Sequence, residues 1–173
     1  SMTFANSYET QPTSSDGVGD GTFTKSFTGR AWTENDSFAF DLSKVSYREN
    51  DQTDPVIEGS DFDNMPMPNP ASVTVTSKDL NENSTTDASF GFGEITFSKP
   101  GIYTYEVVEK DAGTTSEGIS YSDNVATVVF TVTENNPQNG QYSVKCEITY
   151  SDETEKGMFA NVYTSTGALN GET

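Results

Sequence analysis

Lys99-Pro-Gly-Ile-Tyr-Thr-Tyr-Glu-Val-Val-Glu109 is the stretch that decides the fold. The Pro-Gly pair at its start is typical of a tight turn. From Ile102 onward large and polar residues alternate, and successive side chains of a strand point to opposite faces. The stretch therefore predicts a hairpin turn and then a strand with one acid on its aromatic face, which carries Tyr103, Tyr105, Val107 and Glu109.

Other stretches rich in aromatic and β-branched residues lie between turn clusters, and no segment has a convincing helical period. The long segment 49–71 is dense in Asp, Asn and Pro and predicts an excursion from the sheet. Seven or eight strands in this rhythm predict an all-β fold, an immunoglobulin-like β-sandwich. The expected strands are roughly 22–28, 37–42, 72–77, 92–98, 102–109, 125–133, 142–150 and 158–163.

The composition excludes several classes of function. A chain of 173 residues with a net charge of −18 is one acidic domain with tails, which nucleic acid and anionic membranes repel. No apolar run approaches the length of a membrane span, so we expect no membrane insertion from these residues. The strong negative charge predicts poor self-association, and so a monomer in solution. One cysteine and no histidine exclude an internal disulfide, an ordinary zinc site and a histidine base. We expect no cofactor, no metal and no enzyme that turns over an external substrate.

Three expected strands each place one polar residue on an otherwise apolar face. Lys25 lies between two phenylalanines, Glu109 ends the aromatic face described above, and Asn161 lies between Phe159 and Tyr163. Lys and Glu are almost never fully buried unless they are paired, because an unpaired buried charge costs several kcal/mol. The pattern therefore predicts one cluster in the core made of an amine, an acid and an amide.

A short duplication suggests how the chain is organised. The pentapeptide Phe4-Ala-Asn-Ser-Tyr8 is nearly repeated, one domain length later, as Phe159-Ala-Asn-Val-Tyr163. We interpret this as one repeat of a tandem array that carries the last strand of its predecessor. Residues 1–21 are then a tag remnant, that strand and a linker, residues 22–163 are the domain, and residues 164–173 are a C-terminal linker. Asn6 would lack its lysine and stay unreacted.

Five stretches of the sequence form a recognisable series, in this order: Thr24-Lys-Ser-Phe-Thr-Gly-Arg-Ala-Trp32, Ser37-Phe-Ala-Phe-Asp-Leu42, Lys99 to Glu109, Gly118-Ile-Ser-Tyr121 and Phe159 to Tyr163. Together they resemble the isopeptide-linkage domains of Gram-positive pilins and are similar to streptococcal backbone pilin domains. The resemblance covers about residues 22–163. It implies an amide that forms spontaneously between a lysine of the first strand and an asparagine of the last, assisted by a buried acid. The matching residues are Lys25, Asn161 and Glu109.

Each residue type suits that reaction. Burial lowers the pKa of a lysine, which makes the neutral, nucleophilic amine available, and raises the pKa of an acid. A protonated Glu109 can donate to the Asn161 carbonyl oxygen and relay protons while ammonia leaves. A fold that holds amine and amide in contact supplies an effective molarity of roughly 10⁵ M or more.

Other residues are candidates for the catalytic acid, for part of a thioester and for a metal site. Glu106 is a second candidate acid, but it belongs to the opposite face of its strand. Cys146 is expected to be a buried small hydrophobe; a thioester would pair it with a glutamine, and all four glutamines lie near turns or linkers. The acidic loop could hold calcium but lacks the EF-hand spacing, so a solvated loop is favoured. Its acids are Asp51, Asp54, Glu58, Asp61 and Asp63; the glutamines are Gln11, Gln52, Gln138 and Gln141.

We therefore expect a structural stalk repeat of a Gram-positive adhesin or pilus, extracellular and attached to the cell wall through an anchor outside these residues. Its partners would be neighbouring repeats of the same chain and possible host-surface ligands. The alternative is a module that binds a host glycoprotein or carbohydrate through 49–71 or 79–89, where Phe62 is the single aromatic. A pilin polymerised by a sortase through Lys44 or Lys156 is a third candidate.

Overall fold

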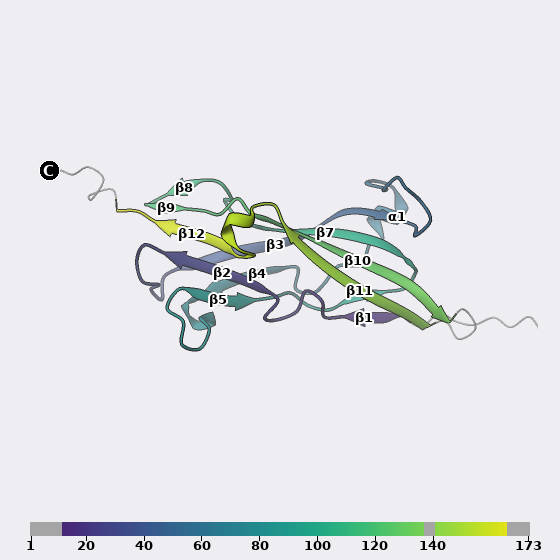
Figure 1. Cartoon of the computed structure of the whole chain (residues 1–173), viewed down its shortest axis with the longest axis horizontal. Helices are drawn as coiled ribbons and strands as arrows, with labels where there is room; N and C mark the ends of the chain where they lie inside the picture. Colours follow the sequence, from purple (N-terminus) through teal and green to yellow (C-terminus); the bar gives the residue numbers. More distant parts are fainter. Residues whose placement is uncertain (1–11, 137–140, 166–173) are drawn as a thin grey trace, which may run out of the picture.

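The computed structural model describes residues 12–136 and 141–165 and is nearly all β (Figure 1). Ten of the twelve strands in the described ranges form two five-stranded sheets, and the other two form a short sheet that adjoins them. The strands are β1 (Thr13–Ser15), β2 (Phe23–Thr28), β3 (Ser37–Arg48), β4 (Ser72–Thr76), β5 (Asp87–Phe90), β6 (Ile95–Phe97), β7 (Gly101–Glu109), β8 (Thr115–Ser116), β9 (Ile119–Ser120), β10 (Val125–Asn136), β11 (Gln141–Tyr150) and β12 (Phe159–Tyr163). Three short helical turns complete the set: α1 (Ser60–Asp63), η1 (Ser77–Asp79) and η2 (Glu153–Glu155).

The first large sheet has the order β11-β10-β7-β3-β4. Strand β7 is central and pairs with β10 on one side and β3 on the other. Its side chains alternate between buried and half-buried along its whole length, as the sequence predicts, because one face of the sheet forms the core. Glu109 ends this buried row, opposite Phe40 of β3.

The second large sheet has the order β5-β2-β12-β9-β8. Strand β12, the last, lies between β2 and β9 and runs parallel to β2, so the strands that begin and end the expected domain 22–163 are neighbours. Phe159 pairs with Lys25, and Asn161 pairs with Phe27. The lysine and the asparagine therefore face the core two residue pairs apart in register.

Aromatic rings fill the space between the sheets. Phe40 of β3 stacks on Phe90 of β5 with ring centroids 4.2 Å apart, and Phe159 meets Phe40 edge to face. Phe27, Trp32 and Phe38 form a second group near Lys25. Such pairs add to the burial energy because ring faces are negative and ring edges positive.

The all-β class and all eight expected strands are confirmed. Four short strands were not expected: β1, β5 and the β8–β9 hairpin. β1 lies within residues 1–21, pairs with β6 and is composed of Thr and Ser, the composition of a linker. The duplicated residues 4–8, which include Asn6, lie outside the described residues.

The described chain enters and leaves at opposite ends of an elongated molecule. β1 lies toward one end, and β12 runs out at the other (Figure 1). The excursion 49–71 leaves the sheet as expected, although Val56 makes an isolated bridge to Tyr47 and residues 60–63 form α1. Within the described ranges, no helix is long and apolar enough to span a bilayer.

Candidate functional site: a buried lysine, glutamate and asparagine

Strand β2 places Lys25 in the core, where its side chain is fully buried. The flanking residues of the same face, Phe23 and Phe27, are also buried, so the amine cannot reach water along the sheet. Its Nζ donates to Glu109 Oε1 at 3.2 Å and to the Phe159 carbonyl oxygen at 3.1 Å. It also lies 4.6 Å from the centre of the Phe38 ring, a favourable position for a cation.

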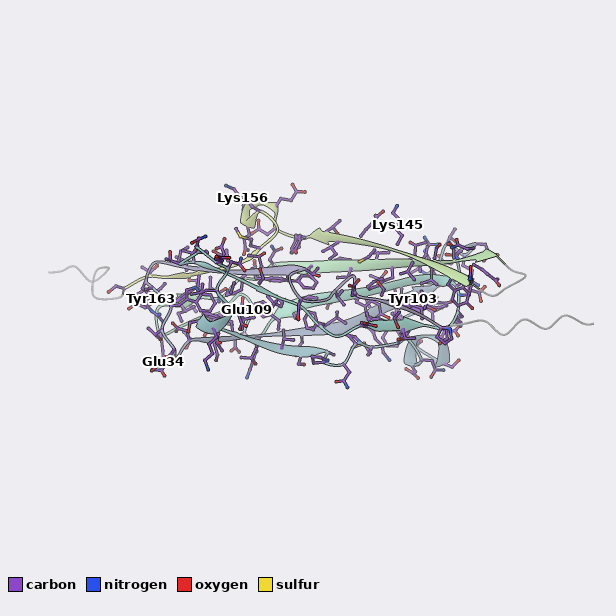
Figure 2. The ribbon with its side chains drawn as sticks, turned by 90° about the horizontal axis from the view of Figure 1, so that it is seen from below. Glu34, Tyr103, Glu109, Lys145, Lys156 and Tyr163 are labelled. Carbon is purple, nitrogen blue, oxygen red and sulfur yellow. The ribbon has the colours of Figure 1, made fainter. Side chains whose placement is uncertain are left out.

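Glu109 lies between the Lys25 amine and the Asn161 amide and contacts both. Its side chain is only 2% exposed, and it lies at the end of β7 between the two sheets. Oε1 faces Lys25, and Oε2 accepts a 2.6 Å hydrogen bond from Asn161 Nδ2. Figure 2 shows Glu109 among the side chains in the half of the molecule that ends at Tyr163, away from Tyr103. One carboxyl group therefore contacts both prospective reaction partners.

Asn161 is fully buried, and its hydrogen bonds determine which way its amide points. The backbone N–H of Ser122 donates to Oδ1 at 2.7 Å. Because a backbone N–H can only donate, its partner must be the oxygen, and Nδ2 must face Glu109. This differs from the expectation that Glu109 donates to the Asn161 carbonyl oxygen: Glu109 faces the nitrogen that would leave, and Ser122 faces the oxygen.

Burial moves both ionisable groups toward their neutral forms. Desolvation lowers the pKa of Lys25 to about 8, although the Glu109 carboxylate opposes this shift. Desolvation likewise raises the pKa of Glu109 to about 7, against the opposing charge of Lys25 and the hydrogen bonds from Asn161 and Lys25. The two groups share one hydrogen bond, so their titrations are coupled. Moving the shared proton from nitrogen to oxygen gives a neutral amine beside a neutral acid.

Two further residues were missed by sequence reasoning: Ser122, which contacts Asn161, and Glu155, which contacts Ser122. Ser122 lies in the connection between β9 and β10 and is 4% exposed. Its hydroxyl donates to Glu155 Oε1 at 2.7 Å, and the same oxygen accepts the backbone N–H of Ala160 at 2.6 Å. Neither residue belongs to an alternating run, so no periodic signal could have identified them.

The structure also places the alternative residues. Glu106 lies on the opposite, half-buried face of β7, as its position in the sequence predicts. Cys146 is half-buried rather than fully buried, because β11 is an edge strand; burial raises the pKa of its thiol to about 11. Among the described residues, the carboxylates that gather most closely are Asp123, Asp152 and Glu155, which are not those of the 49–71 loop.

Comparison with known proteins gives a consistent result. Residues 22–164 match the model of the family FctA, described as the Spy0128-like isopeptide containing domain. A pilin of Streptococcus pyogenes serotype M1 is 35% identical over 82 residues, which are 47% of this chain and 24% of that protein.

Solved structures of the major pilin from Streptococcus pyogenes cover 83% of this chain and 50% of theirs at 24% identity, with TM-scores of 0.49 and, for one variant, 0.51. The T-13 major pilin is similar at 22% identity and a TM-score of 0.47, over 82% of this chain and 51% of its own.

The chain thus spans about a quarter of the curated relative and about half of the solved pilins. The family match extends from just before β2 to just after β12, and so includes all three residues of the buried cluster. This chain belongs to the FctA family of Spy0128-like isopeptide-containing domains.

Proposed function

We propose that this domain is a structural stalk repeat of a Gram-positive surface adhesin or pilus, crosslinked to itself by an amide between Lys25 and Asn161. The observation that carries the proposal is one hydrogen-bonded row, Lys25 to Glu109 to Asn161, in which every side chain is buried. Burial without compensation would be costly for this amine and this acid. A reaction that removes both charges relieves that cost and gives a reason for their presence.

The proposed reaction is a transamidation with Glu109 as the proton carrier. Glu109 first takes a proton from the Lys25 ammonium, and the free amine attacks Asn161 Cγ. Glu109 then protonates Nδ2 and takes a proton from the attacking nitrogen. The Cγ–Nδ2 bond breaks, one ammonia leaves, and Glu109 ends protonated beside the new amide. The position of Oε2 against Nδ2, at 2.6 Å, supports this route for the leaving group.

The mechanical role rests on the topology. β2 and β12 are parallel neighbours, and the described chain enters and leaves at opposite ends. Tension therefore pulls the two strands past each other along their length, and a covalent bond between them carries that load. Residues 26–160 would lie in a closed loop that bears none of it. Unlike a disulfide, the amide is not reduced, which suits a protein outside the cell.

The test is the intact mass of the purified protein. We expect a deficit of one ammonia relative to the sequence, and a proteolytic peptide that joins the segments around Lys25 and Asn161. Glu109→Ala is expected to restore the full mass. Glu106→Ala, on the opposite face of the same strand, is the matched control and is expected to keep the deficit. A full mass in the unmodified protein would refute the crosslink.

A further inference from the structure

The Asn161 carbonyl oxygen has a donor of its own. Its partner is the backbone N–H of Ser122 at 2.7 Å, and the atoms of this hydrogen bond are buried. When an amine adds to an amide carbon, negative charge develops on the carbonyl oxygen. A backbone N–H held against that oxygen in a site without water is the arrangement that stabilises such an intermediate.

Glu155 holds this donor in place. Its Oε1 accepts from the Ser122 hydroxyl at 2.7 Å and from the Ala160 N–H of β12 at 2.6 Å. The carboxylate therefore ties the Ser122 connection to the strand that carries Asn161, one residue before it. The Ser122 hydroxyl also accepts the Asn124 N–H at 3.1 Å, which tightens the turn into β10. Both sides of the Ser122–Asn161 contact are thus positioned by one group.

On the basis of the crosslinking proposed above, we infer that the backbone N–H of Ser122 is the oxyanion donor of the reaction and that Glu155 and the Ser122 hydroxyl are its positioning groups. Glu109 and Ser122 then act on different atoms of Asn161. Glu109 moves protons between the two nitrogens, and the Ser122 N–H stabilises the negative charge on the carbonyl oxygen. As the intermediate collapses, the carbonyl re-forms with its oxygen on the same donor, so the product amide keeps this hydrogen bond.

The direct test removes the N–H and keeps every side chain. The full chain is made by cell-free translation with the hydroxy-acid analogue of serine at position 122, which replaces the N–H by an ester oxygen. Loss of ammonia is then followed by intact mass over time. Removal of one oxyanion donor is expected to slow crosslinking by about 100-fold or more.

The matched control carries the same backbone change at Tyr121. Its N–H donates to the Thr114 carbonyl oxygen at 2.8 Å and does not contact Asn161. We expect that ester to crosslink within about three-fold of the unmodified chain, because it loses a hydrogen bond of the same kind without touching the reacting amide. Equal rates for the two esters would overturn the inference.

Glu155→Gln and Ser122→Ala keep the N–H but weaken its positioning, and both are expected to slow crosslinking by about 10-fold. Ser151→Ala is their control, since its hydroxyl bonds Val125 and Asn124 in the same region but not Ser122. Each substitution is also made in the Glu109→Ala chain, which cannot crosslink. A positioning role requires slower crosslinking with melting temperatures like that of the Ser151→Ala control in this background.

The outcomes separate the two proposals. If the unmodified chain never loses ammonia, the crosslink itself is refuted. If it does, and the Ser122 ester and Glu155→Gln react at control rates, only the oxyanion role is overturned. Should the ester chain fail to fold, the rates of Glu155→Gln and Ser122→Ala against Ser151→Ala decide, and rates equal to the control refute the inference.

Discussion

Removal of the proposed crosslink without leaving a charge in the core should destabilise the domain strongly. The change is Lys25→Met together with Glu109→Gln. Methionine retains the length of the buried lysine stem, and the new glutamine amide can still accept from Asn161 Nδ2 through its oxygen. The crosslinked protein has an amide in place of the ammonium, so both proteins have an uncharged core at this point. Their difference therefore reports the bond and not a buried ion.

The magnitude follows from the length of the loop that the bond closes. Residues 25 to 161 enclose about 140 residues, and the chain-entropy relation for a crosslink of that span gives about 5 kcal/mol at 25 °C. For a domain of this size, 1 kcal/mol corresponds to roughly 2–4 °C. The double variant should therefore melt roughly 10–20 °C below the unmodified protein. Its urea m-value should be higher, because an unfolded chain without the crosslink exposes more surface.

The assays are calorimetry and urea unfolding on samples whose crosslink state is known from intact mass. Glu106→Gln, which changes an acid on the opposite face of β7, should keep the crosslink and stay within about 0.5 kcal/mol of the unmodified protein. The reasoning is refuted if the unmodified protein lacks one ammonia and the double variant nonetheless unfolds within about 1 kcal/mol of it.

Three further predictions concern pH and packing. In Asn161→Ala, which cannot crosslink, the raised pKa of Glu109 should make the free energy of unfolding fall as pH rises from 4.5 to about 7, and the lowered pKa of Lys25 should make it rise again from about 8 to 10.5. Urea titrations at each pH compare this variant with the Lys25→Met, Glu109→Gln chain, and a difference in unfolding free energy that does not change with pH would contradict the prediction. The rate of ammonia loss should pass through a maximum between about pH 7 and 8, because the pair must hold one proton; a rate that still rises at pH 10 would exclude proton transfer through Glu109. Gly91→Ala should cost at least about 2 kcal/mol by calorimetry without changing the mass deficit, since a Cβ there would collide with the Gly19 backbone; an unchanged melting temperature would show that this approach of two chain segments is not rigid.

Alternation along strands carried most of what the sequence could predict. It placed Lys25, Glu109 and Asn161 on core faces, and the structure has all three buried and joined by hydrogen bonds. It also separated Glu109 from Glu106 on one strand. Period-two reasoning works here because each of these strands has a continuous apolar face that must be buried.

What the sequence could not predict depends on contacts between distant loops. Ser122 reaches Asn161, and Glu155 reaches Ser122, from segments without any period, and only the packed fold brings them together. The unexpected strands are short, and β1 pairs through backbone groups that its small polar side chains do not reveal. The expected strand 92–98 begins only at Ile95, because the backbone N–H groups of Phe92 and Gly93 donate to the carbonyl oxygens of Val18 and Pro70, which lie outside the strands.

The complete burial of Lys25 and Asn161 has a consequence for the history of each molecule. Under the proposed chemistry, ammonia departs once, and the new amide is left where water does not reach it, so hydrolysis has no route back. The reaction is then irreversible, and it begins once folding has brought β12 beside β2 with Glu109 between Lys25 and Asn161. A chain that carries the bond has folded correctly at least once, and the bond remains if the chain later unfolds. The mass of each molecule would thus be a permanent record of its own folding.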